Sequence, residues 1–144
     1  MKSDLSSLDL YYLRKEWEVL INGKLDKVYS DDKIFLLQFY VPGKGKKMLK
    51  IMLPNFIFLT DFKKEYTHPN KFCMTLRKYM SNTRLTEIRQ KNFERILEFV
   101  FESHYGTSIL IIEMFSRGNI ILTKQDYTIV VALDYHKWSQ RTIR

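Results

Sequence analysis

The sequence predicts an α+β fold in which two antiparallel β-sheets pack in a sandwich-like arrangement, with one helix at the N-terminus and one in the middle of the chain. Three observations lead to this prediction. Apolar residues repeat at helical spacing near residues 6–23 and 72–80. Short segments rich in β-branched and aromatic residues lie between turn residues elsewhere. The order of helix, strands, helix, strands also lacks the strict alternation of a parallel α/β fold.

The N-terminal helix has start and stop signals in the sequence. A serine at residue 6 or 7 predicts the N-cap, and Asp9 then lies in the first turn, where the helix dipole favours a carboxylate. Gly23 predicts the end, because glycine readily adopts a positive φ at a C-terminal cap. The apolar stripe consists of Leu10, Leu13, Trp17 and Leu20.

Four strands are predicted before the second helix and five after it. Turn residues separate them, notably at 31–32, 43–45 and 117–119, and a hairpin loop is predicted at 103–107. The predicted strands are 25–29, 34–41, 48–53, 55–59, 84–89, 93–102, 108–115, 119–123 and 129–133.

The second helix follows a predicted exposed connection at 61–70. Its spacing turns an apolar face inward and leaves Arg77 and Lys78 on the other side. The inward residues are Phe72, Leu76, Tyr79 and Met80. Because the 144 residues contain neither an internal repeat nor a low-complexity linker, we expect one domain spanning residues 1–144.

The net charge of +8 arises in the middle third of the chain. Residues 41–91 contain twelve lysines and arginines and only three acidic residues, whereas the two flanking regions are nearly balanced. Two interpretations stay open: solvated cations on loops, or an electrostatic surface for a polyanion, of which nucleic acid is the main candidate. Arginines in this region suit phosphate groups because the guanidinium binds them bidentately.

Arg95 is the least expected residue, because alternation over 93–102 places it on the apolar face of a strand. A guanidinium keeps its proton, so on a buried face it needs a partner. Glu113 interrupts another apolar strand, and a five-residue loop between the strands would place it directly opposite Arg95, whereas a four-residue loop would move it to the other face. Arg95 is therefore either part of a structural ion pair or a recognition residue.

Residue patterns for catalysis or cofactor binding are weak. Glu94, Glu98 and Glu102 occupy every second outward position of the predicted strand, which is typical of a solvated sheet face. The three histidines are scattered along the chain, so none completes a set of metal ligands with them. The glycines at 43 and 45 do not have the spacing of a phosphate-binding P-loop. Cys73 is the single cysteine of the chain, which favours a reducing compartment. Neither a signal peptide nor an apolar run of about 20 residues occurs. We expect a cytoplasmic, non-enzymatic protein without metal, cofactor or membrane contact.

Five segments together carry a family resemblance. They are SLDL at 7–10, GKLDKVY at 23–29, FCMTLRKY at 72–79, FERI at 93–96 and IEMFSRGNIIL at 112–122. The order of these segments and their residue types resemble those of the N-terminal domain of the NFACT family. This family comprises ribosome quality-control factors that are also known as fibronectin-binding-protein-like proteins. The resemblance spans nearly the whole chain.

The resemblance implies a non-catalytic RNA-binding domain of a factor that recognises stalled large ribosomal subunits carrying peptidyl-tRNA and recruits tRNA. It implies roles for Asp9 and for the Glu94-Arg95 pair, in which glutamate replaces the aspartate of the family. The implied partners are tRNA, the large ribosomal subunit and the remaining family domains: a helix-hairpin-helix region, a coiled coil and another RNA-binding domain, in cis or as a separate chain. The expected RNA-binding residues are Asp9, Arg77, Lys78, Arg84, Arg89, Lys91, Glu94, Arg95 and Arg117.

Two alternatives stay open. One is a protein-interaction scaffold in which Arg95 forms a structural ion pair. The other is a catalytically inactive, nucleic-acid-binding relative of the formamidopyrimidine-DNA glycosylases, whose N-terminal domain the family domain resembles. Those enzymes use an N-terminal proline amine followed by glutamate, whereas Lys2 and Ser3 follow Met1 here, so glycosylase chemistry is not expected.

Overall fold

The fold comes from a computed structural model that describes residues 5–61, 66, 69–91 and 94–135. Its helices are α1 (Ser7–Trp17), continued by a 3₁₀ turn η1 (Glu18–Leu20), and α2 (Lys71–Met80). Its strands are β1 (Lys24–Asp31), β2 (Ile34–Val41), β3 (Gly45–Met52), β4 (Phe56–Thr60), β5 (Arg84–Gln90), β6 (Ile96–Ser103), β7 (Gly106–Glu113), β8 (Asn119–Lys124) and β9 (Ile129–Ala132). Most of the predicted 61–70 connection, and Phe93, lie outside the described residues.

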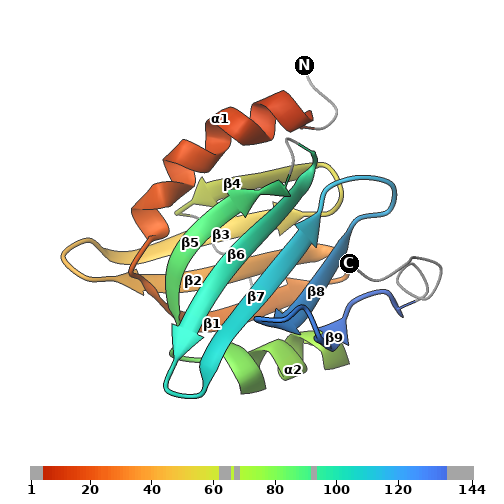
Figure 1. Ribbon diagram of the computed structural model, residues 1–144. Helices are drawn as coiled ribbons and strands as arrows, with labels where there is room; N and C mark the ends of the chain where they lie inside the picture. The colour runs from red at the N-terminus through yellow and green to blue at the C-terminus, as the bar shows by residue number, and fades with distance from the viewer. Residues whose placement is uncertain (1–4, 62–65, 67–68, 92–93, 136–144) are drawn as a thin grey trace.

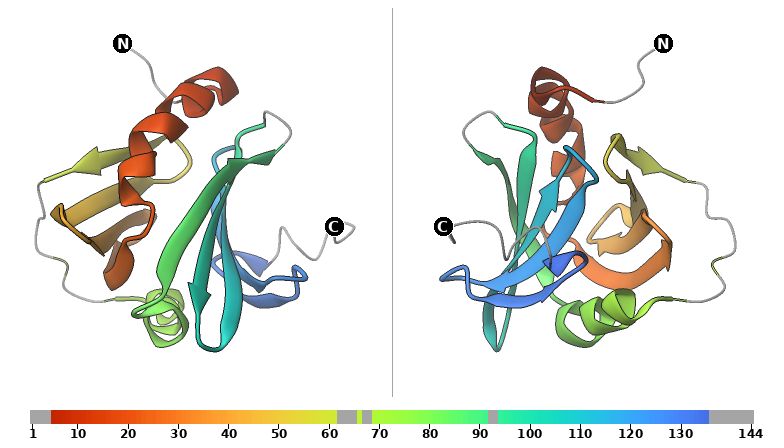
Figure 2. Two further views of the ribbon diagram at one scale, coloured as in Figure 1. Left: turned by 60° about the vertical axis from the view of Figure 1, so that its left-hand side comes forward. Right: turned by 90° about the vertical axis from the view of Figure 1, so that its right-hand side faces the viewer.

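The strands form one nine-stranded antiparallel sheet in the order β4-β3-β2-β1-β5-β6-β7-β8-β9 (Figure 1). The expected division into two separate sheets is not seen, because β1 and β5 join the halves. Their ladder is short: Lys24 pairs with Arg84, and Leu25 N–H donates to the Thr83 carbonyl at 2.9 Å. Such a short junction allows the sheet to bend sharply, and the two halves then face each other (Figure 2).

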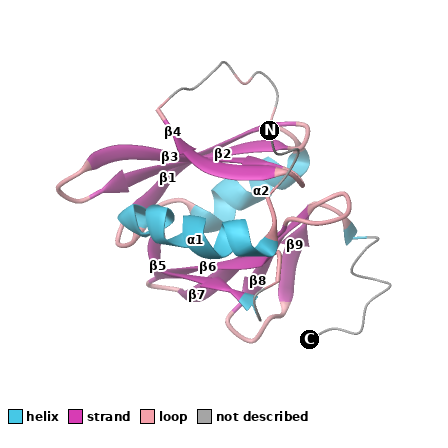
Figure 3. Ribbon diagram, turned by 90° about the horizontal axis from the view of Figure 1, so that it is seen from above, coloured by secondary structure: helices cyan, strands magenta, loops and turns pink. Residues whose placement is uncertain are grey.

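One main apolar core lies between the two halves of the sheet. Phe39 of β2 stacks with Phe101 of β6 at a centroid distance of 6.2 Å, and Trp17 of α1 packs at 6.3 Å from Phe99. Helix α1 contacts β4 and β5, and α2 contacts β1 and β9, so each helix touches both halves. Figure 3 shows α1 lying between the halves. The α+β class with an N-terminal and a central helix is therefore confirmed.

The start of α1 is confirmed, but its end differs from the prediction. Ser6 is the N-cap: Asp9 N–H donates to Ser6 Oγ at 3.1 Å, and Ser6 N–H donates to Asp9 Oδ2 at 2.9 Å. The positive φ after the helix belongs to Asn22 at 75°, not to Gly23. Gly23 is required by space instead, because a Cβ there would lie 2.9 Å from both the Leu20 carbonyl oxygen and the Val41 side chain.

Asn70 is the N-cap of α2, and its side-chain Oδ1 accepts a hydrogen bond from Cys73 N–H at 2.7 Å. The inward positions of Phe72 and Met80 are confirmed, with both side chains buried. The inward position of Tyr79 was wrong, because that ring is 51% exposed. Tyr79 lies at the edge of the apolar stripe, where the helix turns away from the core.

The strand around Arg95 starts later than predicted. β6 begins at Ile96, and Arg95 lies in the bend before it, although its carbonyl still accepts from Met114 N–H at 2.8 Å. The β6–β7 hairpin has a two-residue turn between Ser103 and Gly106 rather than the expected longer loop. This register places Glu113 opposite Ile96, one position away from the place opposite Arg95.

The outer face of β6 is not solvated throughout, contrary to expectation. Glu94 and Glu102 are exposed, but Glu98 is only 3% exposed. A second apolar cluster covers this face, because Tyr127, just before β9, and Ile129, the first residue of β9, pack against apolar residues of β6, β7 and β8. The buried members are Ile96, Ile109, Ile111, Ile121 and Ala132.

Candidate functional site

The two motif positions implied by the family resemblance meet at one end of the sheet. Gln90 at the end of β5 joins them: its Nε2 donates to the Ser7 carbonyl of α1 at 2.9 Å and to the Glu94 carbonyl at 2.6 Å. One side-chain amide therefore holds the first turn of α1, which contains Asp9, against the bend that contains Glu94 and Arg95. We call this arrangement the Gln90 clasp.

Further turns join the clasp to form what we call the loop end, made of five turns: the first turn of α1 and the turns that include residues 31–33, 53–55, 90–91 with 94–95, and 114–118. Lys33 Nζ donates to the Arg117 carbonyl at 2.7 Å, and Leu53 N–H donates to the Lys33 carbonyl at 3.1 Å. Leu5 N–H donates to the Asn55 carbonyl at 2.9 Å. With the Arg95–Met114 backbone bond, these contacts tie the five turns together, so the side chains of the loop end have a defined frame.

Charges of both signs lie at the loop end. Asp9, Lys33 and Arg95 are half-buried, whereas Glu94 and Arg117 are exposed. A guanidinium donates in a fixed fork that fits a phosphate, and carboxylates accept from hydroxyl groups such as those of ribose. This mixture favours recognition by specific contacts over attraction by a purely basic surface.

Two other predicted residues, Arg89 and Lys91, lie on the outer face of β5 and just after it. Arg89 Nη2 donates to Glu98 Oε1 at 3.0 Å, and Tyr127 Oη donates to the same oxygen at 2.9 Å. Glu87 Oε1 lies 3.7 Å from Arg89 Nη1, and Lys91 Nζ lies 5.6 Å from the centre of the Tyr127 ring. Arg89 thus compensates the charge of a buried carboxylate and supports the cover of the second apolar cluster.

The remaining predicted cations lie away from the loop end. Arg84, at the start of β5, donates to Asn22 Oδ1 at 2.9 Å and lies 3.7 Å from Glu102. On α2, Arg77 Nε donates to the Val28 carbonyl at 2.8 Å. Lys78 is exposed on the same helix. The structure therefore brings together Asp9, Glu94, Arg95 and Arg117, and it separates them from Arg77, Lys78 and Arg84.

Sequence reasoning missed two residues of the loop end, Gln90 and Lys33. Gln90 carried no signal, because its partners are backbone carbonyls distant in sequence. Lys33 follows a recognisable turn, but its contact with the 114–118 turn depends on tertiary packing.

The described residues offer neither a cluster of metal ligands nor a helix suited to a membrane. Among the described residues, no group of three or more His, Cys, Asp and Glu side chains is arranged to hold a metal ion. Within the same part of the chain, no helix is long and apolar enough to cross a membrane.

Comparison with known proteins places these features in context. Residues 6–144 match the family described as NFACT N-terminal and middle domains. The chain is 37% identical, over 99% of its length, to the archaeal Rqc2 homolog aRqcH of Methanocaldococcus jannaschii, and 33% identical, over 94% of its length, to the human ribosome quality control complex subunit NEMF. It spans 22% and 13% of the lengths of those two proteins, respectively.

Solved structures resemble the same fold. The N-terminal domain of fibronectin-binding protein PavA from Streptococcus pneumoniae superposes with a TM-score of 0.83 at 25% identity, covering 96% of this chain and 57% of that one. The N-terminal part of the fibronectin/fibrinogen-binding protein of Streptococcus suis gives the same TM-score and identity, covering 98% and 58%.

Proposed function

The chain belongs to the NFACT family and corresponds to the N-terminal part of its ribosome quality-control members, and from this premise we propose that it is a non-catalytic RNA-binding domain. Its ligand is tRNA or ribosomal RNA on stalled large ribosomal subunits that carry peptidyl-tRNA. It works in the cytoplasm together with the remaining NFACT domains, in cis or on a separate chain.

The observation that carries the proposal is the Gln90 clasp. It joins Asp9 to the Glu94-Arg95 pair, two positions that lie 85 residues apart in the sequence and that the family resemblance singles out. In the proposed complex, Arg95 contacts a phosphate, while Asp9 and Glu94 accept hydrogen bonds from RNA hydroxyl groups. Arg117, exposed at the same end, adds a second cation.

The test is tRNA binding by Arg95→Ala, measured by fluorescence anisotropy over a salt titration. Loss of a charge-assisted hydrogen bond costs about 1.5–3 kcal/mol, so we expect affinity to fall roughly 10- to 150-fold. The slope of log K against log salt should also flatten by about one unit or less, because one phosphate contact is lost. Lys44→Ala is the matched control, since Lys44 is an exposed cation in the β2–β3 turn, at the other end of β2 from the loop end.

The alternatives predict different results. A scaffold in which Arg95 is only structural predicts unchanged tRNA binding together with a loss of stability of about 3–5 kcal/mol in Arg95→Ala. An Arg77→Ala/Lys78→Ala double variant tests whether α2 takes part, and a slope reduced in that variant alone would move the RNA site from the loop end to α2. Cleavage of abasic DNA by the chain would contradict a non-catalytic role.

A further inference from the structure

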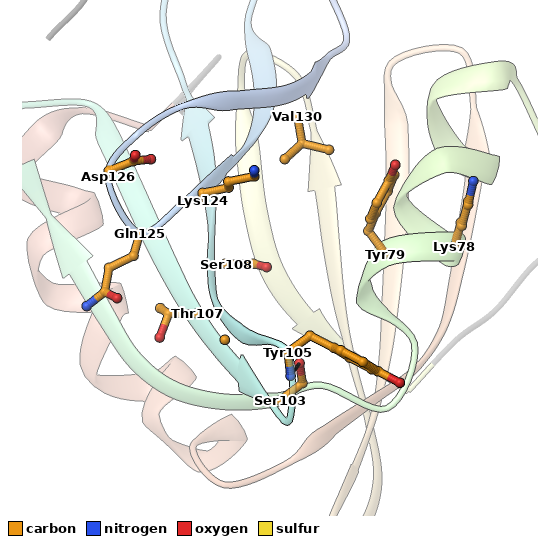
Figure 4. Close-up of a pocket in the computed structure, with 11 residues that line it drawn as sticks. Lys78, Tyr79, Ser103, Tyr105, Thr107, Ser108, Lys124, Gln125, Asp126 and Val130 are labelled. Atoms are coloured by element: carbon orange, nitrogen blue, oxygen red, sulfur yellow. Dashed lines mark hydrogen bonds between the residues drawn. The ribbon is translucent and has the colours of Figure 1, made fainter.

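A cavity lies away from the loop end, where α2, the β6–β7 turn and the β8–β9 turn meet. Its volume is about 700 Å³, in the usual range for small-molecule sites. We call it the tyrosine groove, because Tyr79 of α2 and Tyr105 of the β6–β7 turn stand at its rim (Figure 4). Its other polar lining includes Lys78, Ser108, Lys124, Gln125 and Asp126.

The two tyrosine side chains are too exposed to contribute much to the apolar core. Tyr105 is 100% exposed at the tip of a two-residue turn, and Tyr79 is 51% exposed. A large ring fully in water contributes no burial to folding, so its packing surface remains available to a ligand. Lys78 Nζ lies 5.5 Å from the centre of the Tyr79 ring, which places a cation beside an aromatic face.

The charges of the groove differ from one side to the other. In Figure 4, Tyr79 and Tyr105 lie on one side, and Gln125 and Asp126 lie across from them. Hydrogen bonds from Thr128 lower the pKa of Asp126, so this carboxylate is ionised at neutral pH. A phosphate backbone is therefore disfavoured beside Asp126 and favoured near Lys78, while the amide of Gln125 offers donors and an acceptor for a base edge.

We propose that the tyrosine groove binds one or two nucleotides of single-stranded RNA, with bases stacked on Tyr79 and Tyr105 and a phosphate at Lys78. Exposed aromatic faces beside lysines are the usual means of holding single strands without a fixed sequence. The inference rests on the proposed function for the identity of the ligand, but it assigns a second site. That site lies about 25 Å from the loop end, since β6 runs eight residues between them at about 3.3 Å per residue.

The test measures anisotropy of a fluorescein-labelled octauridylate with the chain and its variants. We expect Tyr105→Ala and Tyr79→Ala each to weaken binding about 5- to 100-fold, the usual effect of removing one stacking ring. Tyr105→Phe should bind within about twofold of the wild type, because the ring face is kept. Tyr12→Ala is the matched control: Tyr12 is 61% exposed on α1, outside the groove.

The outcomes separate this inference from the proposed function. Loss of octauridylate binding in Tyr105→Ala, with Arg95→Ala unaffected, supports a groove that acts separately from the loop end. The inference is overturned if the wild type does not bind octauridylate, or if Tyr105→Ala and Tyr79→Ala behave like Tyr12→Ala. Failure of the proposed function has a different readout, which is unchanged tRNA binding by Arg95→Ala.

Discussion

The Gln90 clasp makes a prediction that separates positioning from simple stability. In Gln90→Ala, the Ser7 and Glu94 carbonyls lose their common donor, whose bonds are 2.9 and 2.6 Å long. A hydrogen bond between neutral groups contributes about 0.5–1.5 kcal/mol net, so the free energy of unfolding should fall by about 1–3 kcal/mol. For a domain of this size, that loss lowers the Tm by about 4–10 °C.

The expected functional effect is larger than this stability loss alone would cause. At 25 °C, a protein with ordinary stability remains folded after losing about 2 kcal/mol. If the clasp positions Asp9 relative to Arg95, tRNA affinity should nevertheless fall. Without the clasp, part of the binding free energy is used to bring Asp9 and Arg95 into the arrangement that the ligand requires. We expect a weakening of about 5- to 30-fold in anisotropy titrations, corresponding to about 1–2 kcal/mol.

Gln38→Ala is the matched control for the clasp. Gln38 is a buried glutamine on β2, and its Nε2 donates to Asp26 Oδ2 at 2.9 Å, away from the loop end. Its removal should lower stability by about 1–3 kcal/mol and leave tRNA affinity unchanged. If Gln90→Ala loses stability but binds tRNA as tightly as Gln38→Ala does, the clasp is only structural and the reasoning is refuted.

Three other predictions concern stability and are checked by urea unfolding. Gly118→Ala should lower the free energy of unfolding by about 2–4 kcal/mol, because φ is 78° and a Cβ would lie 2.8 Å from a leucine side chain. Gly43→Ala, which has the same φ but open space around the Cβ, should lower it by only about 1–2 kcal/mol. Tyr127→Phe should cost about 1–2 kcal/mol, since Glu98 loses a donor, and an unchanged midpoint would contradict this. Ser6→Ala should cost about 1 kcal/mol through loss of the N-cap, and no change would show that the capping box is not needed.

Local signals account for the elements that the sequence predicted well. The serine cap of α1 and the turn glycines at 43 and 45 act through bonds and φ angles within a few residues, and the structure has all of them. Alternation likewise predicts individual strands, because it reports which side chains face the core. These signals are short in range, so they are readable from one sequence.

The joining of the two halves into one sheet could not be predicted in this way. It depends on the close approach of β1 to β5, where Leu85 N–H donates to the Gly23 carbonyl at 2.9 Å. Those residues lie 62 positions apart, and no periodic pattern encodes their pairing. Glu98 is a similar case: its alternation is typical of a solvated face, but Tyr127, 29 residues later, covers it and donates to it.

Arg95 illustrates how a position can be noticed for the wrong reason and still be the right one to test. Strand alternation singled it out, yet it lies before β6, so alternation does not set the direction of its side chain. Its backbone is fixed from both sides, by the bond from Met114 N–H to its own carbonyl and by the Gln90 bond to the Glu94 carbonyl. Neither bond uses the guanidinium. Replacement by alanine leaves both backbone bonds possible and removes the guanidinium. Measuring tRNA affinity and the free energy of unfolding on the same variant therefore distinguishes a role in recognition from a structural role.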